Sequence, residues 1–172
     1  GTTHETGAIY FTGGAGVGSA NRTLGVASTV EFSSAIASTG NFGIIKTGAG
    51  DLILSPANTF TGATQINGGT VVVSHKDALA ANSSVFPSTT AGFGILRLAT
   101  DTSVVINRIE TSSSNPGTVV SDRATPGAGI NHVIPAFWAG ANTYTFAAGS
   151  NVTSGTAGVT FNSLSLTAGS SS

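Results

Sequence analysis

Seven carboxylates are the side chains of this sequence that could perform acid–base chemistry. Enzymes that cleave polysaccharides place two carboxyl groups close together, or combine acids with a metal ion and a basic residue. The acids here are scattered, so two can meet only if the chain coils with a period of about 21 residues. That period brings Glu31 beside Asp51 and Asp101 beside Asp122. We favour the simpler interpretation that these acids are solvated turn residues.

The other candidates for catalysis or cofactor binding lack the spacing that their chemistry needs. His4, His75 and His132 lie too far apart in sequence for a paired metal site, and there is no cysteine. The Gly-rich run at 13–19 lacks the Lys-Ser/Thr end of a phosphate loop, and we expect a turn between coils there. A calcium-binding roll requires repeats of Gly-Gly-x-Gly-x-Asp, which are missing. We therefore expect no catalytic, cofactor or metal site.

An aromatic pair is the best candidate for a surface contact. Phe137 and Trp138 lie in the sequence PAFWAG, residues 135–140, and Trp138 is the only tryptophan. We interpret this segment as a loop between coils. Aromatic side chains in such a loop either bind sugars or a protein partner, or cover the core.

The composition indicates which elements position these residues and which partners are excluded. Charged residues make up 8% of the 172 residues, the net charge is −1, and glycine occurs 24 times. No basic patch is present for nucleic acid, and no apolar run of membrane-spanning length occurs, so we expect neither nucleic-acid binding nor membrane insertion by this segment. Abundant Thr, Val and Gly favour strands joined by tight turns.

Short strands recur along the whole chain. Only residues 75–82 have a helical pattern, with room for one or two turns. Strands this short and this frequent favour a β-solenoid over a sandwich, because a sandwich needs longer alternating strands. The predicted strands are 8–12, 28–32, 51–55, 59–61, 64–66, 70–74, 95–99, 103–107, 118–121, 143–146 and 159–166.

A short motif recurs and defines the expected corners. The sequence ANTFT at 57–61 returns as ANTYT at 141–145, an offset that equals four coils of about 21 residues. Asparagine tolerates left-handed backbone and can stack as a hydrogen-bonded ladder. We expect corner or ladder positions at Asn58, Asn142, Gly48, Gly50, Gly62 and Gly69.

The segment GIIKTGAGDLILSPANTFTGATQINGGTVVVS and the DALA that follows it resemble the autotransporter-associated β-strand repeat. The resemblance is clear over residues 43–79 and weaker over 158–169. Two positions depart from the family pattern, because Pro56 replaces a glycine and Asp51 a threonine. The resemblance implies a right-handed parallel β-helix in a large exported bacterial surface protein, and it does not imply an enzyme.

These observations predict one all-β solenoid domain over residues 1–172, cut from a longer exported protein and located outside the bacterium. Neither end of the sequence carries the polar cap of a free-standing solenoid. Our leading hypothesis is a non-enzymatic structural protein whose copies pair head to tail into a filament or surface layer. The alternative is an adhesin passenger segment that binds surface glycans. The third is a carbohydrate-active enzyme using one of the two acid pairs.

Overall fold

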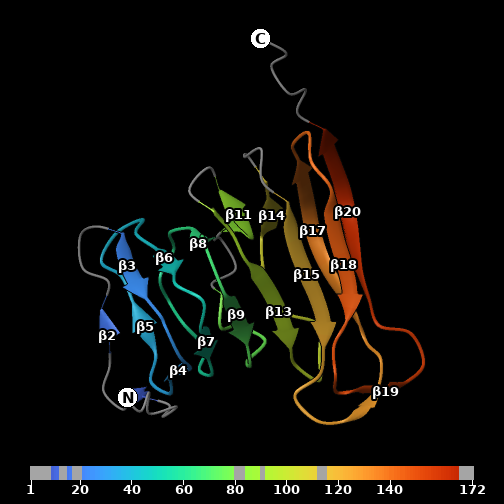
Figure 1. Ribbon diagram of the computed structural model, residues 1–172, viewed down its shortest axis with the longest axis horizontal. Helices are drawn as coiled ribbons and strands as arrows, with labels where there is room; N and C mark the ends of the chain where they lie inside the picture. Colours follow the sequence, from blue (N-terminus) through green and yellow to red (C-terminus); the bar gives the residue numbers. More distant parts are fainter. Residues whose placement is uncertain are drawn as a thin grey trace, which may run out of the picture.

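Two parallel seven-stranded sheets form the body of the protein in a computed structural model, which describes residues 9–11, 15–16, 21–79, 84–89, 92–111 and 116–166 (Figure 1). The first sheet contains, in spatial order, β1 (Ile9–Phe11), β4 (Val30–Phe32), β7 (Asp51–Leu54), β9 (Thr70–Val73), β13 (Ile95–Ala99), β15 (Gly117–Asp122) and β18 (Tyr144–Ala148). The second contains β3 (Arg22–Gly25), β6 (Ile44–Thr47), β8 (Thr64–Ile66), β10 (Ser84–Phe86), β14 (Arg108–Glu110), β17 (Asn131–Ala139) and β20 (Gly158–Leu166). The chain alternates between the two sheets, so it winds as a β-solenoid. The predicted fold class is confirmed.

Alternation of apolar and polar residues explains why these segments stack. In β7, Leu52 and Leu54 point inward and are fully buried, while Asp51 and Ile53 face outward and are partly exposed. Each inward residue lies beside its equivalent on the next coil, as Leu52 does beside Val71. Full burial of such a side chain contributes about 1.5–3 kcal/mol, and it is achieved only when neighbouring coils stack.

A third, less regular side of each coil connects the first sheet to the second. It begins with β2 (Ala15–Gly16), which pairs with β5 (Ile36–Ala37), and it ends with β16 (Gly127–Ala128), which pairs with β19 (Val152–Ser154). Between these pairs the described residues of the third side form no strand. The predictions of strands at 59–61 and 103–107 are therefore wrong, although Phe60 and Ile106 in these segments are buried in the core.

Residues 75–79 also belong to this third side, and they form a turn in place of the predicted helix. The amide of Ala78 donates a hydrogen bond to the carbonyl of His75 at 3.0 Å. Ala78 and Leu79 are fully buried, so the pattern that suggested a helix comes from residues packed against the core. Residues 80–82 of the predicted helix lie outside the described part of the chain.

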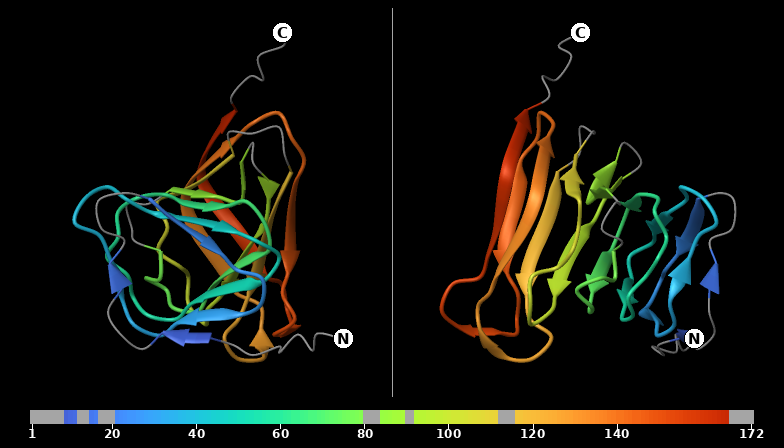
Figure 2. Two further views of the ribbon diagram at one scale, coloured as in Figure 1. Left: turned by 60° about the vertical axis from the view of Figure 1, so that its left-hand side comes forward. Right: turned by 180° about the vertical axis from the view of Figure 1, so that it is seen from behind.

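The coils enlarge from the N-terminal to the C-terminal end, which a uniform period of about 21 residues does not predict. Ile44 pairs with Thr64, 20 residues further on, whereas Ile109 pairs with Phe137, 28 residues further on. β17 and β20 have nine residues each, and β3 and β6 have four. The lengthening is visible from behind, where the last strands are the tallest of the stack (Figure 2).

One hairpin interrupts the coils. β11 (Ser88–Thr89) and β12 (Gly92–Phe93) pair antiparallel in the connection between β10 and β13. Phe93 in this hairpin is 63% exposed. Among the described residues, the chain has no helix of the length and hydropathy that a membrane crossing needs.

Candidate functional site

Asn58 lies on the third side and links three successive coils. Its Oδ1 accepts a hydrogen bond from the amide of Ile36 at 2.8 Å, and its Nδ2 donates one to the carbonyl of Ala78 at 2.6 Å. The side chain is buried, so both bonds are shielded from water. The Asn58 side chain therefore adds two hydrogen bonds to the backbone bonds that link these coils, from the Asn58 amide to the Asp77 carbonyl and from the Thr59 amide to the Ile36 carbonyl.

Asn142 does not occupy an equivalent place. It follows β17 of the second sheet and precedes β18 of the first, whereas Asn58 follows β7 of the first sheet and precedes β8 of the second. The two copies of the motif thus lie at opposite connections of the coil. The prediction that their offset equals four coils is wrong, because the coils between them differ in length.

The expected corner glycines lie against the backbone of the preceding coil. Gly48 has φ of 81°, and a Cβ there would approach the carbonyl oxygen of Val26 to 2.5 Å. A Cβ on Gly50 would overlap the backbone of Ser28, and one on Gly62 that of Phe42. Gly69 combines a φ of 60° with a Cβ position 2.7 Å from the Lys46 ammonium nitrogen. Close stacking explains glycine here better than ligand binding does.

Lys46 is a buried cation that sequence analysis did not single out. Its side chain points inward from β6, and its Nζ donates to the carbonyls of Gly48 and Gly68, both at 2.8 Å, and of Thr47 at 3.2 Å. Burial lowers the pKa of Lys46, and the carboxylate of Asp51 opposes this effect. A lysine among the inward apolar positions of GIIKTG is the sequence signal that could have identified it.

The first acid pair, Glu31 and Asp51, lies on neighbouring strands of the first sheet. Glu31 is opposite Ile53, so Asp51 is offset from it by two residues along the strand. The carboxylate of Glu31 accepts a hydrogen bond from the hydroxyl of Ser55. The structure thus places both acids on the outer face of the sheet at a diagonal spacing, which is about 7–8 Å between Cα atoms in a sheet.

In the second acid pair, Asp101 and Asp122 each form an ion pair with an arginine. Asp122 is fully buried and accepts a hydrogen bond from Nε of Arg97 at 2.7 Å. It also accepts bonds from the backbone amides of Arg123 at 2.8 Å and Asn151 at 3.0 Å. Burial raises the pKa of the Asp122 carboxyl, but these hydrogen bonds outweigh burial and hold the pKa below its usual value.

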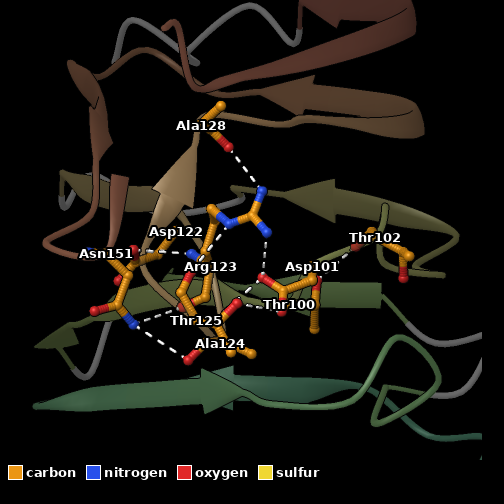
Figure 3. A network of polar contacts seen from close by, with 9 residues as sticks. All are labelled: Thr100, Asp101, Thr102, Asp122, Arg123, Ala124, Thr125, Ala128 and Asn151. Carbon is orange, nitrogen blue, oxygen red and sulfur yellow. Dashed lines mark hydrogen bonds and ion pairs between the residues drawn. The ribbon is translucent and has the colours of Figure 1, made fainter. Parts of the chain in front are cut away.

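Asp101 has a different arginine (Figure 3). Its carboxylate lies 3.0 Å from Nη2 of Arg123 and accepts a bond from the hydroxyl of Thr125 at 2.8 Å. The hydrogen bond from Thr125 is the main reason that the pKa of Asp101 is lowered. The side chain of Asn151 donates to the carbonyl of Arg123 at 2.8 Å, which joins both acids into one network. Each of these two carboxylates thus pairs with its own arginine, and the network connects the loops that carry them.

His132 is a buried group inside the enlarged coils. Its Nδ1 accepts a hydrogen bond from the amide of Val104 at 3.4 Å, and its Nε2 makes no hydrogen bond of good geometry among the described residues. Burial lowers the pKa of His132, while the nearby backbone of Asp122 and Leu98 opposes this effect. Burial therefore favours the neutral form of the imidazole. No group of three or more His, Cys, Asp or Glu that could hold a metal is present in the described part of the chain.

Phe137 and Trp138 lie on a strand, and the prediction of a loop at 135–140 is wrong over residues 135–139. Both belong to β17, so they point to opposite faces of the second sheet. Phe137 is buried and stacks on Phe161, with ring centroids 4.9 Å apart. Trp138 faces outward, and Arg108 lies over its ring at 4.2 Å from the centroid. Phe137 is thus a core residue, and Trp138 is available on the surface.

The last coil exposes residues that point toward the core. β18 and β20 are the outermost described strands of their sheets. Phe146 on β18 is 46% exposed, and Leu164 and Leu166 on β20 are 62% and 76% exposed. Phe146 lies beside the buried Val119, and Leu164 beside the buried Phe137. These three side chains therefore continue the core row, and no described strand lies over them.

Comparison with known proteins identifies part of the chain. Residues 44–73 match the passenger-associated transport repeat. A stretch of 93 residues, 51% of this chain, is 37% identical to the adhesin BmaC autotransporter of Brucella suis biovar 1 (strain 1330) and covers 2% of that protein. No solved structure matches the chain significantly. The family match confirms the resemblance recognised over 43–79, and the findings indicate a surface-exposed, extracellular location.

Proposed function

We propose that this chain is a non-enzymatic passenger segment of an adhesin-like surface protein. The match of residues 44–73 to the passenger-associated transport repeat supports this proposal. The observation that carries the proposal is the stack of coils. Stacking sets side chains from distant parts of the sequence in rows on two outer sheet faces, which suits the display of a binding surface. The ion pairs of Asp101 and Asp122 support a structural role for these acids.

The adhesin character rests on the similarity to the Brucella protein, whose name describes an adhesin. The chain spans 2% of the length of that relative. The exposed Trp138 gives the segment an aromatic contact residue of the type that recurs in binding surfaces.

Surface display tests this function. The chain is presented on a non-adherent bacterium through an autotransporter translocation unit, and adhesion to epithelial monolayers is compared with cells that display the translocation unit alone. We expect increased adhesion, and no release of reducing sugar from polysaccharides. Unchanged adhesion would contradict the adhesin role. Sugar release that is lost in Asp101→Asn or Asp122→Asn would contradict the non-enzymatic role.

End-to-end stacking of copies is the second candidate, and the exposed Phe146, Leu164 and Leu166 favour it. The unequal ends weigh against it, since the nine-residue β20 would face the four-residue β3 of the next copy. Sedimentation velocity over a range of concentrations distinguishes end-to-end stacking from a monomer. Species that lengthen with concentration support stacking, and a constant monomer contradicts it.

A further inference from the structure

The outer face of the second sheet carries an apolar strip along β17. Val133, Pro135 and Trp138 are exposed, with 44% of Val133 and 38% of Trp138 accessible to solvent. None of these side chains contributes to the core, because the buried residues of the same strand, such as Ile134 and Phe137, point the other way. The strip is therefore not explained by folding.

Polar side chains line both edges of the strip. On β20, Thr160, Ser163 and Ser165 lie beside Val133, Ala136 and Trp138. On β14, Arg108 lies beside Ala136, and Glu110 beside Trp138. Trp138 thus has a hydroxyl group on one side and a carboxylate on the other, all on the same face of three neighbouring strands.

A charged side chain, Arg108, contacts the ring of Trp138. The guanidinium of Arg108 lies 4.2 Å from the centroid of the Trp138 ring, within the range of a cation–π interaction. Nε of Arg108 in turn lies 2.7 Å from the carboxylate of Glu110. Glu110 thus holds the guanidinium that contacts the ring, and the charges of Arg108 and Glu110 balance.

We propose that this surface, defined by Trp138, Arg108, Glu110 and Ser165, binds a neutral glycan. A pyranose ring presents apolar C–H groups on its face and hydroxyls around its rim. Its face would stack on Trp138 and its hydroxyls would bond to the polar side chains on either side, which is the combination of apolar and polar contacts found in small-ligand sites.

The charge of the surface argues for a neutral sugar. An acidic sugar needs an unpaired cation, and the charge of Arg108 is already balanced by Glu110. This assignment rests on the proposed adhesin role and adds to it the residues and the ligand class.

The single tryptophan makes binding directly measurable, because all indole fluorescence of the chain comes from Trp138. The probes are cellotetraose, chitotetraose and mannotetraose, with a hyaluronan tetrasaccharide as the acidic comparison. We expect a saturable blue shift of the emission and protection from iodide quenching with at least one neutral probe. No saturable change with any neutral probe, or tighter binding of hyaluronan, would overturn the proposal.

Variants locate the site by titration calorimetry. We expect Trp138→Ala to weaken binding of the neutral probe at least about tenfold, and Phe93→Ala, on the β11–β12 hairpin, to leave it unchanged. Glu110→Gln releases the charge of Arg108, so we expect it to create measurable affinity for hyaluronan. Thermal unfolding of each variant checks the fold. Equal affinity of folded Trp138→Ala and the unaltered chain would overturn the site.

Adhesion separates this proposal from the function on which it rests. If displayed Trp138→Ala adheres as well as the unaltered chain, the glycan site is wrong and the adhesin role stands. If the unaltered chain confers no adhesion but binds the neutral probe through Trp138, the site stands and the adhesin role is wrong.

Discussion

The ammonium group of Lys46 donates a hydrogen bond to the carbonyl of Gly68, one coil further along the chain, at 2.8 Å. The same nitrogen bonds to the carbonyl of Gly48 at the turn of its own coil. Because the side chain is fully buried, the lysine ties two stacked turns together inside the core. A charge-assisted hydrogen bond of this kind is stronger than one between neutral groups.

Replacing Lys46 by methionine keeps the length and apolar volume of the side chain but leaves buried carbonyls without a donor. We expect Lys46→Met to lower the free energy of unfolding by about 2–3 kcal/mol. Lys76, whose side chain is 52% exposed and pairs with Asp77, provides the control. Lys76→Met should change stability by less than about 0.5 kcal/mol. Urea denaturation measures both, and equal effects would contradict the bridging role of Lys46.

Asn58 should contribute more to the free energy of unfolding than an exposed asparagine does. Asn58→Ala removes the partners of the Ile36 amide and the Ala78 carbonyl, so we expect a loss of about 2–4 kcal/mol. Asn41, which is exposed, serves as the matched position, and Asn41→Ala should be near neutral. The two variants are compared by chemical denaturation. A similar small effect at both positions would show that Asn58 does not link the coils.

The close spacing of the coils predicts that alanine destabilises the protein at one glycine and is tolerated at another. A methyl group on Gly62 would overlap the backbone of Phe42, so Gly62→Ala must separate two coils and should cost about 3 kcal/mol. On Gly25 the nearest atom to an added Cβ is the Thr47 hydroxyl at 3.7 Å, an ordinary contact. Gly25→Ala should therefore be tolerated or slightly stabilising. Thermal unfolding compares them, and the opposite order would be incompatible with the stacking described.

Acidification should destabilise the enlarged coils through His132. Burial lowers the pKa of this histidine in the folded protein, so the unfolded chain takes up its proton first as the pH falls. The free energy of unfolding should therefore decrease from about pH 6.5 downward, before the carboxylates titrate. The chain with His132→Leu should lose this dependence, and His75→Gln, at a half-exposed position, should retain it. Urea midpoints between pH 7.5 and pH 5 measure the effect. A midpoint that is constant in the unaltered chain would contradict it.

The sequence predicts the fold class because strand and turn signals are local. Leu52 and Leu54 alternate with outward residues, and Gly48 and Gly50 mark the turn before them, so this part of the stack follows from residues 43–74 alone. Segments 59–61 and 103–107 have the same apolar pattern as strands, and their inward residues are buried as a strand's would be. Whether such a segment forms a strand depends on pairing with the neighbouring coils, which are distant in sequence. A pattern of five residues therefore does not show that these two segments lack strand pairing.

The candidate surface was predicted in part. The sequence marks both Phe137 and Trp138 as candidates for a surface contact, but only Trp138 is exposed, because strand geometry turns successive side chains to opposite faces and buries Phe137. Arg108 and Glu110 could not be assigned to the same surface, since only the 28-residue step of the enlarged coil brings them beside Ala136 and Trp138. The bridging role of Lys46 escapes sequence analysis for a similar reason, because one of its partners, Gly68, lies on the next coil.

The stacking of coils is the premise of every proposal above, and a distance between two spin labels tests it most directly. Glu31, Ile53, Val72, Arg97, Val120 and Ala147 form one outward row across the first sheet. Because the chain has no cysteine, labels on Glu31→Cys and Ala147→Cys report on this row alone. Five strand spacings predict a single population with backbones about 24 Å apart, and the Glu31→Cys and Val120→Cys pair should give about 19 Å. A broad distribution, or distances that do not grow with the number of strands between the labels, would contradict the stack.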